Sequence, residues 1–223
     1  MIPAISIWGW ISLGKCALVV AALLAWALGR KALGAASNWL GLQLVAALVA
    51  EGAATALSFQ GENNLRVYDA YLPVEFVALL CYALIWSGLQ RAKGIILGVC
   101  LTLYGLVLWN ELPTAWNKQS FTTTGYLLGG LVLVCASVFA LFRIAMRSEV
   151  PMMKVPSTWV LLSIVVFFGG SIPLLGLTNS LIERQVAWAP NMYFINDGLY
   201  LFRYGCVLVA VCIGLRNTTP SPA

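Results

Sequence analysis

Seven long apolar runs divide this chain of 223 residues, and they constrain its fold more than any other feature. A helix needs about 20 mostly apolar residues to cross a bilayer. Six of the runs have that length, whereas the fourth is shorter and would have to recruit its flanks. We therefore predict an all-α fold, a polytopic membrane bundle of seven transmembrane helices that forms a single domain over residues 1–223. The runs cover residues 4–28, 39–59, 68–89, 94–109, 124–146, 157–177 and 193–215.

The composition agrees with a multi-pass protein of the cell membrane, since 61% of the residues are hydrophobic and only 9% are charged. The connections between the runs are too short for a soluble domain. The first run contains Lys15 and lacks a basic segment before it. We therefore expect a retained helix there, not a cleaved signal peptide.

Basic residues are divided unequally between the two sets of connections. Three fall on one side, namely Arg66, Lys118 and Arg184. The other side has eight, and cytoplasmic loops carry an excess of Lys and Arg. The division predicts an N-terminus outside and a cytoplasmic C-terminus. It also explains the net charge of +5 without a nucleic-acid partner, and leaves membrane lipids as the expected surroundings. The eight are Arg30, Lys31, Arg91, Lys93, Arg143, Arg147, Lys154 and Arg216.

The chain contains no histidine, which restricts its chemistry. Catalytic triads and zinc or haem sites that depend on imidazole are excluded. The six cysteines lie inside apolar runs without a C-x-x-C spacing, so they behave as small apolar side chains. The last run lacks a lysine for a retinal Schiff base. We expect neither a metal nor a cofactor.

Four ionisable residues, Lys15, Glu51, Glu75 and Arg203, lie inside apolar runs. A charge at the centre of a membrane helix costs about 2.5–3.5 kcal/mol on insertion scales, so each one needs a partner. We predict that Glu75 pairs with Arg203 or Lys15, and that Glu51 pairs with one of these bases or with a tyrosine hydroxyl. Such residues form either a structural ion-pair network or a working pocket, and the sequence leaves both open.

Two polar stripes begin near the same end of the predicted bundle. One lies on the third run (Tyr68, Tyr71, Glu75) and the other on the last run (Asn196, Tyr200, Arg203). The residues of each stripe are spaced so that they share one helical face, and both helices would run inward from the outside. Asp69 and Asp197 lie at the outer ends, where each could cap the N-terminus of its helix. We predict one polar, ligand-binding cavity in the outer half of the bundle, lined by Glu51, Tyr68, Tyr71, Glu75, Asn196, Tyr200 and Arg203.

The two stripes also align with each other without a gap. Asp69 matches Asp197, and Glu75 falls opposite Arg203. The match suggests a 3+1+3 plan, in which a parallel repeat of three helices flanks a central linker helix.

Residues 63–76 read N-N-L-R-V-Y-D-A-Y-L-P-V-E-F. This segment resembles uncharacterised bacterial seven-helix membrane proteins, whose pattern has N-N, then Tyr-His, then Tyr, then Glu-Phe at this spacing. The resemblance implies an inner-membrane protein and adds no activity. This chain departs from the pattern at Asp69, where the family has histidine. The resemblance implies that five residues are features of that family, namely Asn63, Tyr68, Tyr71, Glu75 and Glu51.

Three functions fit these observations. The first is a transporter-like bundle that binds or transports a small polar or amphipathic ligand, similar in outline to SWEET and PQ-loop transporters but without their P-Q signature. The second is an accessory subunit or receptor with a membrane-protein partner. The third is an enzyme acting on a lipid or isoprenoid with carboxylates as acid and base. We rank them in that order, so an enzyme is the least expected.

Overall fold

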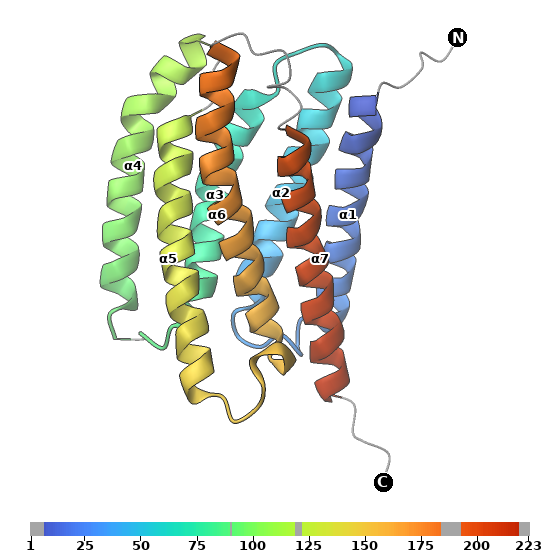
Figure 1. Cartoon of the computed structure of the whole chain (residues 1–223), viewed down its shortest axis with the longest axis vertical. Helices are drawn as coiled ribbons and strands as arrows, with labels where there is room; N and C mark the ends of the chain where they lie inside the picture. Colours follow the sequence, from blue (N-terminus) through green and yellow to red (C-terminus); the bar gives the residue numbers. More distant parts are fainter. Residues whose placement is uncertain (1–6, 90, 119–121, 184–192, 219–223) are drawn as a thin grey trace.

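The fold was analysed in a computed structural model, which describes residues 7–89, 91–118, 122–183 and 193–218. Over these residues it contains helices and no strands, and seven of the helices are long and apolar enough to cross a membrane. They run alternately up and down (Figure 1), which confirms the predicted seven-helix bundle. The helices are α1 (Ile7–Gly29), α2 (Ser37–Phe59), α3 (Leu65–Trp86), α4 (Lys93–Lys118), α5 (Thr123–Arg147), α6 (Pro156–Glu183) and α7 (Tyr193–Thr218), with a 3-10 turn, η1 (Met152–Lys154), before α6.

Several predicted helix ends differ from the observed ones, and α6 continues beyond its predicted end at residue 177 to Glu183. Helix α3 ends at Trp86 because Gly88 has a φ of 71°, and a glycine in this left-handed conformation ends many helices. Helix α4 continues well beyond residue 109, and its membrane-spanning part covers Lys93–Thr114. The flanks therefore supply the length that the fourth apolar run lacks. Asn110 is tolerated there because its side chain donates to the carbonyl of Leu106 in the same helix, at 2.9 Å.

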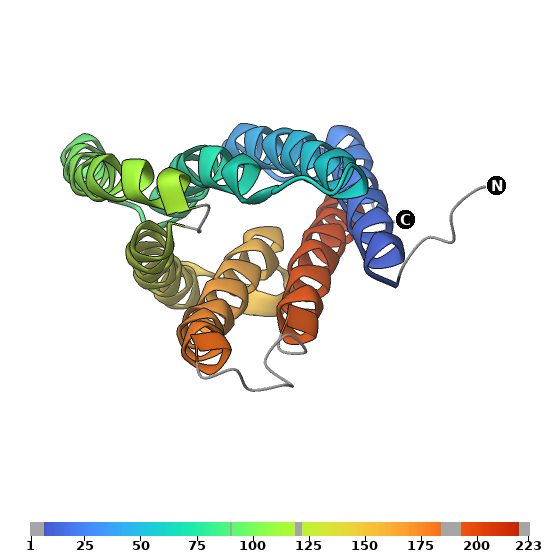
Figure 2. The same ribbon diagram turned by 90° about the horizontal axis from the view of Figure 1, so that it is seen from above.

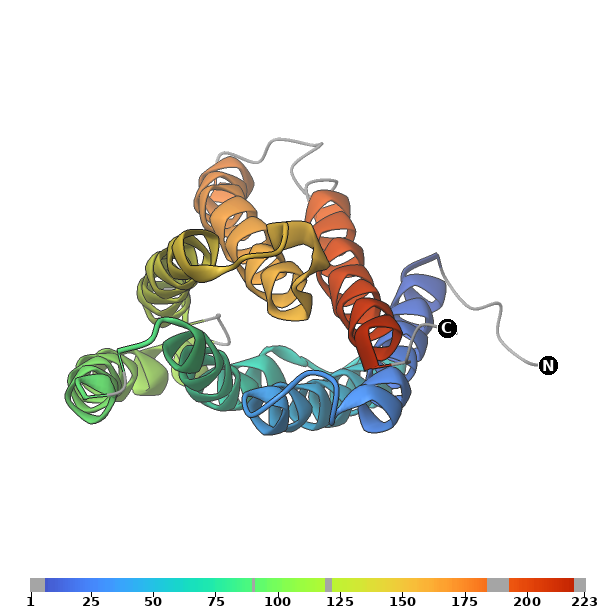
Figure 3. The same ribbon diagram turned by 90° about the horizontal axis from the view of Figure 1, so that it is seen from below.

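Six of the helices form a closed ring. Each of α1, α2, α3, α5, α6 and α7 packs against the next in that order, and α7 returns to α1. Helix α4 stands outside the ring against α3 and α5, as the views from the two ends show (Figures 2 and 3). This arrangement places α4 outside two groups of three helices, α1–α3 and α5–α7. The duplication itself stays a prediction.

Small residues let neighbouring helices approach closely, as is common in membrane bundles. A Cβ atom at Gly129 would lie 2.9 Å from the ring of Tyr104 on α4. One at Gly130 would lie 3.2 Å from Phe168 on α6. The two glycines therefore let α5 pack tightly against α4 on one side and α6 on the other.

The eight basic residues assigned to the cytoplasmic side all belong to one end of the bundle, where α1, α3, α5 and α7 end. Arg66 lies at the other end, beside the start of α3. Arg184 and the side chain of Lys118 lie outside the described residues. The side of the membrane that each end faces stays a prediction.

Candidate functional site

A cavity of about 360 Å³ lies inside the ring. Helices α1, α2, α3, α5, α6 and α7 all contribute to its wall, whereas α4 does not. Lys15 and Asp197 line it, together with all seven residues that the two polar stripes and Glu51 led us to expect: Glu51, Tyr68, Tyr71, Glu75, Asn196, Tyr200 and Arg203.

The deep part of the cavity contains an ion pair between Glu75 and Arg203. One oxygen of Glu75, Oε1, lies 2.6 Å from Nη1 of Arg203, and both side chains are almost completely buried. Glu75 and Arg203 each lie ten residues after the start of their helices, Leu65 and Tyr193, so they reach the same depth of about 15 Å. This pair confirms one of the two partners predicted for Glu75.

Several neighbours hold this ion pair in place. The hydroxyl of Tyr71, one turn before Glu75 on α3, donates to the same carboxylate oxygen at 2.8 Å. The guanidinium of Arg203 lies over the ring of Phe167, 4.8 Å from its centroid, and 5.6 Å from that of Tyr204. Such stacking favours a cation. Nη2 of Arg203 is buried and has no hydrogen-bond partner among the described residues.

Gln43 completes the deep part of the site, and the sequence analysis missed it. Its side-chain nitrogen donates to the hydroxyl of Tyr71 at 2.8 Å and to that of Tyr204 at 3.2 Å, which joins α2 to α3 and α7. Gln43 is only 1% exposed. The available signal was a lone amide in the apolar run that also contains Glu51.

The shallow part of the cavity lies nearer the end where α1 begins. There Lys15 of α1 forms an ion pair with Asp197 of α7, with both side chains largely buried. Glu51, on α2, accepts a hydrogen bond from the hydroxyl of Tyr68 at 3.2 Å. The predicted tyrosine partner of Glu51 is therefore confirmed, while Lys15 pairs with Asp197, a residue that the sequence analysis considered as a helix cap.

Asn196 and Tyr200 complete the wall on α7. The amide oxygen of Asn196 accepts a hydrogen bond from the hydroxyl of Ser171 on α6 at 3.1 Å. The ring of Tyr200 lies between Lys15, whose ammonium is 5.5 Å from the ring centroid, and the ring of Tyr204 at 4.7 Å. Asn196 and Tyr200 therefore connect the shallow part of the cavity to its deep part.

Two predicted polar residues lie away from this cavity. Asp69 is buried, and one of its oxygens accepts hydrogen bonds from the backbone N–H of Thr122 at 3.1 Å and from its hydroxyl at 2.7 Å. It therefore holds the start of α5, whereas the sequence analysis considered it as a cap for its own helix. Asn63 accepts a hydrogen bond from the N–H of Leu65 at 2.9 Å and so supports the start of α3.

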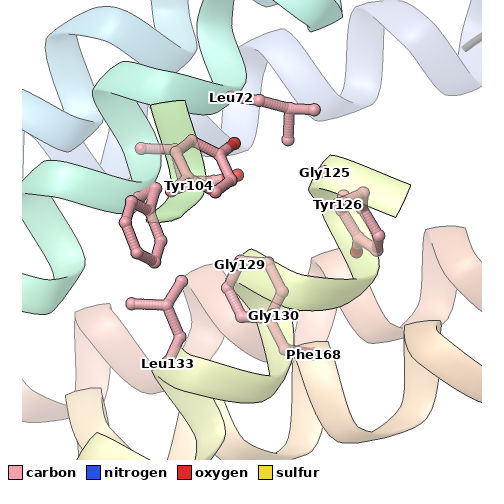
Figure 4. Close-up of a pocket in the computed structure, with 10 residues that line it drawn as sticks. Leu72, Tyr104, Gly125, Tyr126, Gly129, Gly130, Leu133 and Phe168 are labelled. Atoms are coloured by element: carbon pink, nitrogen blue, oxygen red, sulfur yellow. The ribbon is translucent and has the colours of Figure 1, made fainter. Parts of the chain in front are cut away.

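A second, much smaller cavity of about 10 Å³ lies between α3, α4, α5 and α6 (Figure 4). It is bounded by Tyr104, Gly129 and Phe168, and it has room for about one water molecule. Glu75 lines this space as well as the large cavity. Glu75 therefore belongs to the wall between the two cavities, as do Leu72 and Tyr126.

The arrangement suits the binding of polar and charged groups. Within the described residues, no three side chains of His, Cys, Asp or Glu come together as a metal site would require. Fold and site together define a multi-pass helical membrane protein with an internal cavity whose wall combines apolar surface with polar and charged groups. Comparison with protein-family models, curated proteins and solved structures gives no match for this chain.

Proposed function

We propose that this protein binds a small polar or amphipathic ligand in the large cavity and holds it there or carries it across the membrane. The observation that supports this function best is the cavity itself. Protein interiors are close-packed, so an ion-pair network that only fixed the register of the helices would need no empty space beside it. Here two ion pairs and Glu51 face about 360 Å³ of space, within the usual range of about 300–1,000 Å³ for ligand sites.

The chemistry of the wall supports a polar ligand. The wall combines the charged groups of Lys15, Glu51 and Arg203 with the rings of Tyr71, Phe167 and Tyr200, which offer apolar contact. We propose that the ligand enters from the outside. Both polar stripes start at the end where α3 and α7 begin, and the excess of basic residues favours a cytoplasmic position for the opposite end.

We also propose that the chain is a member of the bacterial family that residues 63–76 resemble and that it lies in the inner membrane. The support comes from the motif residues, because Tyr68, Tyr71 and Glu75 all take part in hydrogen bonds at the cavity wall. A functional assay of a second protein with the same motif checks this relation.

The substitution Glu75→Gln tests the function. It removes the charge that Arg203 faces in the cavity, so we expect the protein to insert and fold but to lose ligand binding. The measurement is a thermal-shift screen of purified wild-type and variant protein against amines, carboxylic acids and sugars. Glu62→Gln is the matched control, because it removes a carboxylate that is exposed and outside the cavity. A lower melting temperature with unchanged ligand response in Glu75→Gln would instead support a purely structural ion pair.

A further inference from the structure

We propose that the ligand of the large cavity carries a positively charged amine and that Glu51 binds it. This inference rests on the proposed function and adds the chemical class of the ligand.

The first argument is the charge balance of the wall. Among the described residues, three carboxylates and two bases line the cavity. Glu75 is paired with Arg203, and Asp197 is paired with Lys15. Glu51 is left over, so the wall carries one excess negative charge when every group is ionised.

The second argument is the surroundings of Glu51. Glu51 is only 6% exposed, and within the described part of the chain no base lies at ion-pair distance from it. Its hydrogen-bond partner, the hydroxyl of Tyr68, is neutral. The charge of Lys15 also acts on Glu51, but Lys15 already forms an ion pair with Asp197. A buried carboxylate whose neighbouring base is paired with another acid is costly, and a cation in the adjacent space lowers that cost. A ligand amine could approach Glu51 from the cavity, which this residue lines.

The third argument is the aromatic wall. Tyr68, Tyr126, Tyr200 and Phe167 line the same space. Two of these rings already face cations, since Lys15 lies 5.5 Å from the centroid of Tyr200 and Arg203 lies 4.8 Å from that of Phe167. Aromatic faces attract ammonium groups and repel carboxylates. The wall therefore favours an amine over an anion of the same size.

The experiment compares three probes of similar shape, namely benzylamine, benzyl alcohol and benzoate. Each is titrated against the purified full-length protein, and binding is followed by isothermal calorimetry and thermal shift. We expect benzylamine to bind more tightly than the other two. Glu51→Gln should weaken benzylamine binding at least tenfold, while Glu62→Gln should leave it unchanged.

A second variant keeps the test informative if Glu51→Gln fails to fold. Tyr68→Phe removes the hydroxyl that occupies Glu51 and keeps the charge, so benzylamine should bind at least as tightly as to the wild type. Equal binding of the three probes, or benzylamine binding that survives Glu51→Gln, contradicts the proposal that Glu51 binds a ligand amine. Either result leaves the proposed function of the cavity standing. Binding of none of the probes counts against both.

Discussion

At the scale of single residues, Gln43 shows how one side chain can organise a membrane site. It donates two hydrogen bonds, to Tyr71 and Tyr204, and Tyr71 in turn donates to Glu75. In Gln43→Leu both tyrosine hydroxyls lose a buried donor. We expect the free energy of unfolding to fall by about 1–3 kcal/mol, the usual cost of leaving buried polar groups unsatisfied. Thermal unfolding in detergent measures this loss.

The control for Gln43→Leu is Thr102→Val on α4. The hydroxyl of Thr102 is exposed and bonds only to Gly98 of its own helix, so its removal should change the melting temperature little. Equal effects of the two substitutions would show that Gln43 is not a structural link between helices.

At the scale of the elements, α1 and α2 are joined by a contact that requires glycine. A Cβ atom at Gly41 would overlap the ring of Trp26, whose indole N–H also donates to the carbonyl of Ser37 at 2.8 Å. Gly41→Ala should therefore separate the two helices and lower the stability by about 1–3 kcal/mol, as overpacked sites do.

Helix α2 supplies its own control for that substitution. Nothing lies within 4 Å of a Cβ atom at Gly52, so Gly52→Ala introduces no clash and should keep or raise the stability, because alanine favours the helix. Comparison of the two melting temperatures isolates the packing effect from helix propensity. A destabilising Gly52→Ala beside a neutral Gly41→Ala would contradict the observed contact.

At the scale of the whole molecule, Lys15 and Asp197 join the first helix to the last and so help to close the ring. Lys15→Asp and Asp197→Lys each place like charges together, and both should lower the melting temperature. The double exchange restores opposite charges and should recover part of the loss. A double-mutant cycle should give a coupling of roughly 0.5–3 kcal/mol, as for other residues in contact. A coupling energy of zero would show that this ion pair does not stabilise the closed ring.

The orientation of the molecule is a separate prediction, based on the basic residues at one end of the bundle. Ala35, in the turn before α2, and Glu62, in the turn before α3, are both exposed and lie at opposite ends. In intact cells, a maleimide that cannot cross membranes should label Glu62→Cys and spare Ala35→Cys. The unmodified protein controls for its own cysteines. The reverse pattern would invert the topology.

The sequence by itself determined those features that depend on short stretches of chain. Apolar runs of sufficient length predicted the seven helices, because a bilayer demands about 20 such residues whatever the rest of the chain does. The spacing of Tyr68, Tyr71 and Glu75 placed them on one face of α3, because helical periodicity is a local property. The cost of buried charge then predicted that Glu75 and Glu51 have partners, and the structure contains an allowed partner for each.

Only the tertiary structure decided which groups meet across helices that are distant in sequence. The choice of Asp197 for Lys15, and of Thr122 for Asp69, depends on how the ring closes and where α5 begins. The place of Gln43 between two tyrosines has the same origin. Such partners follow from the packing of whole helix faces, which no short segment specifies, so several pairings remain equally satisfactory until the helices are assembled.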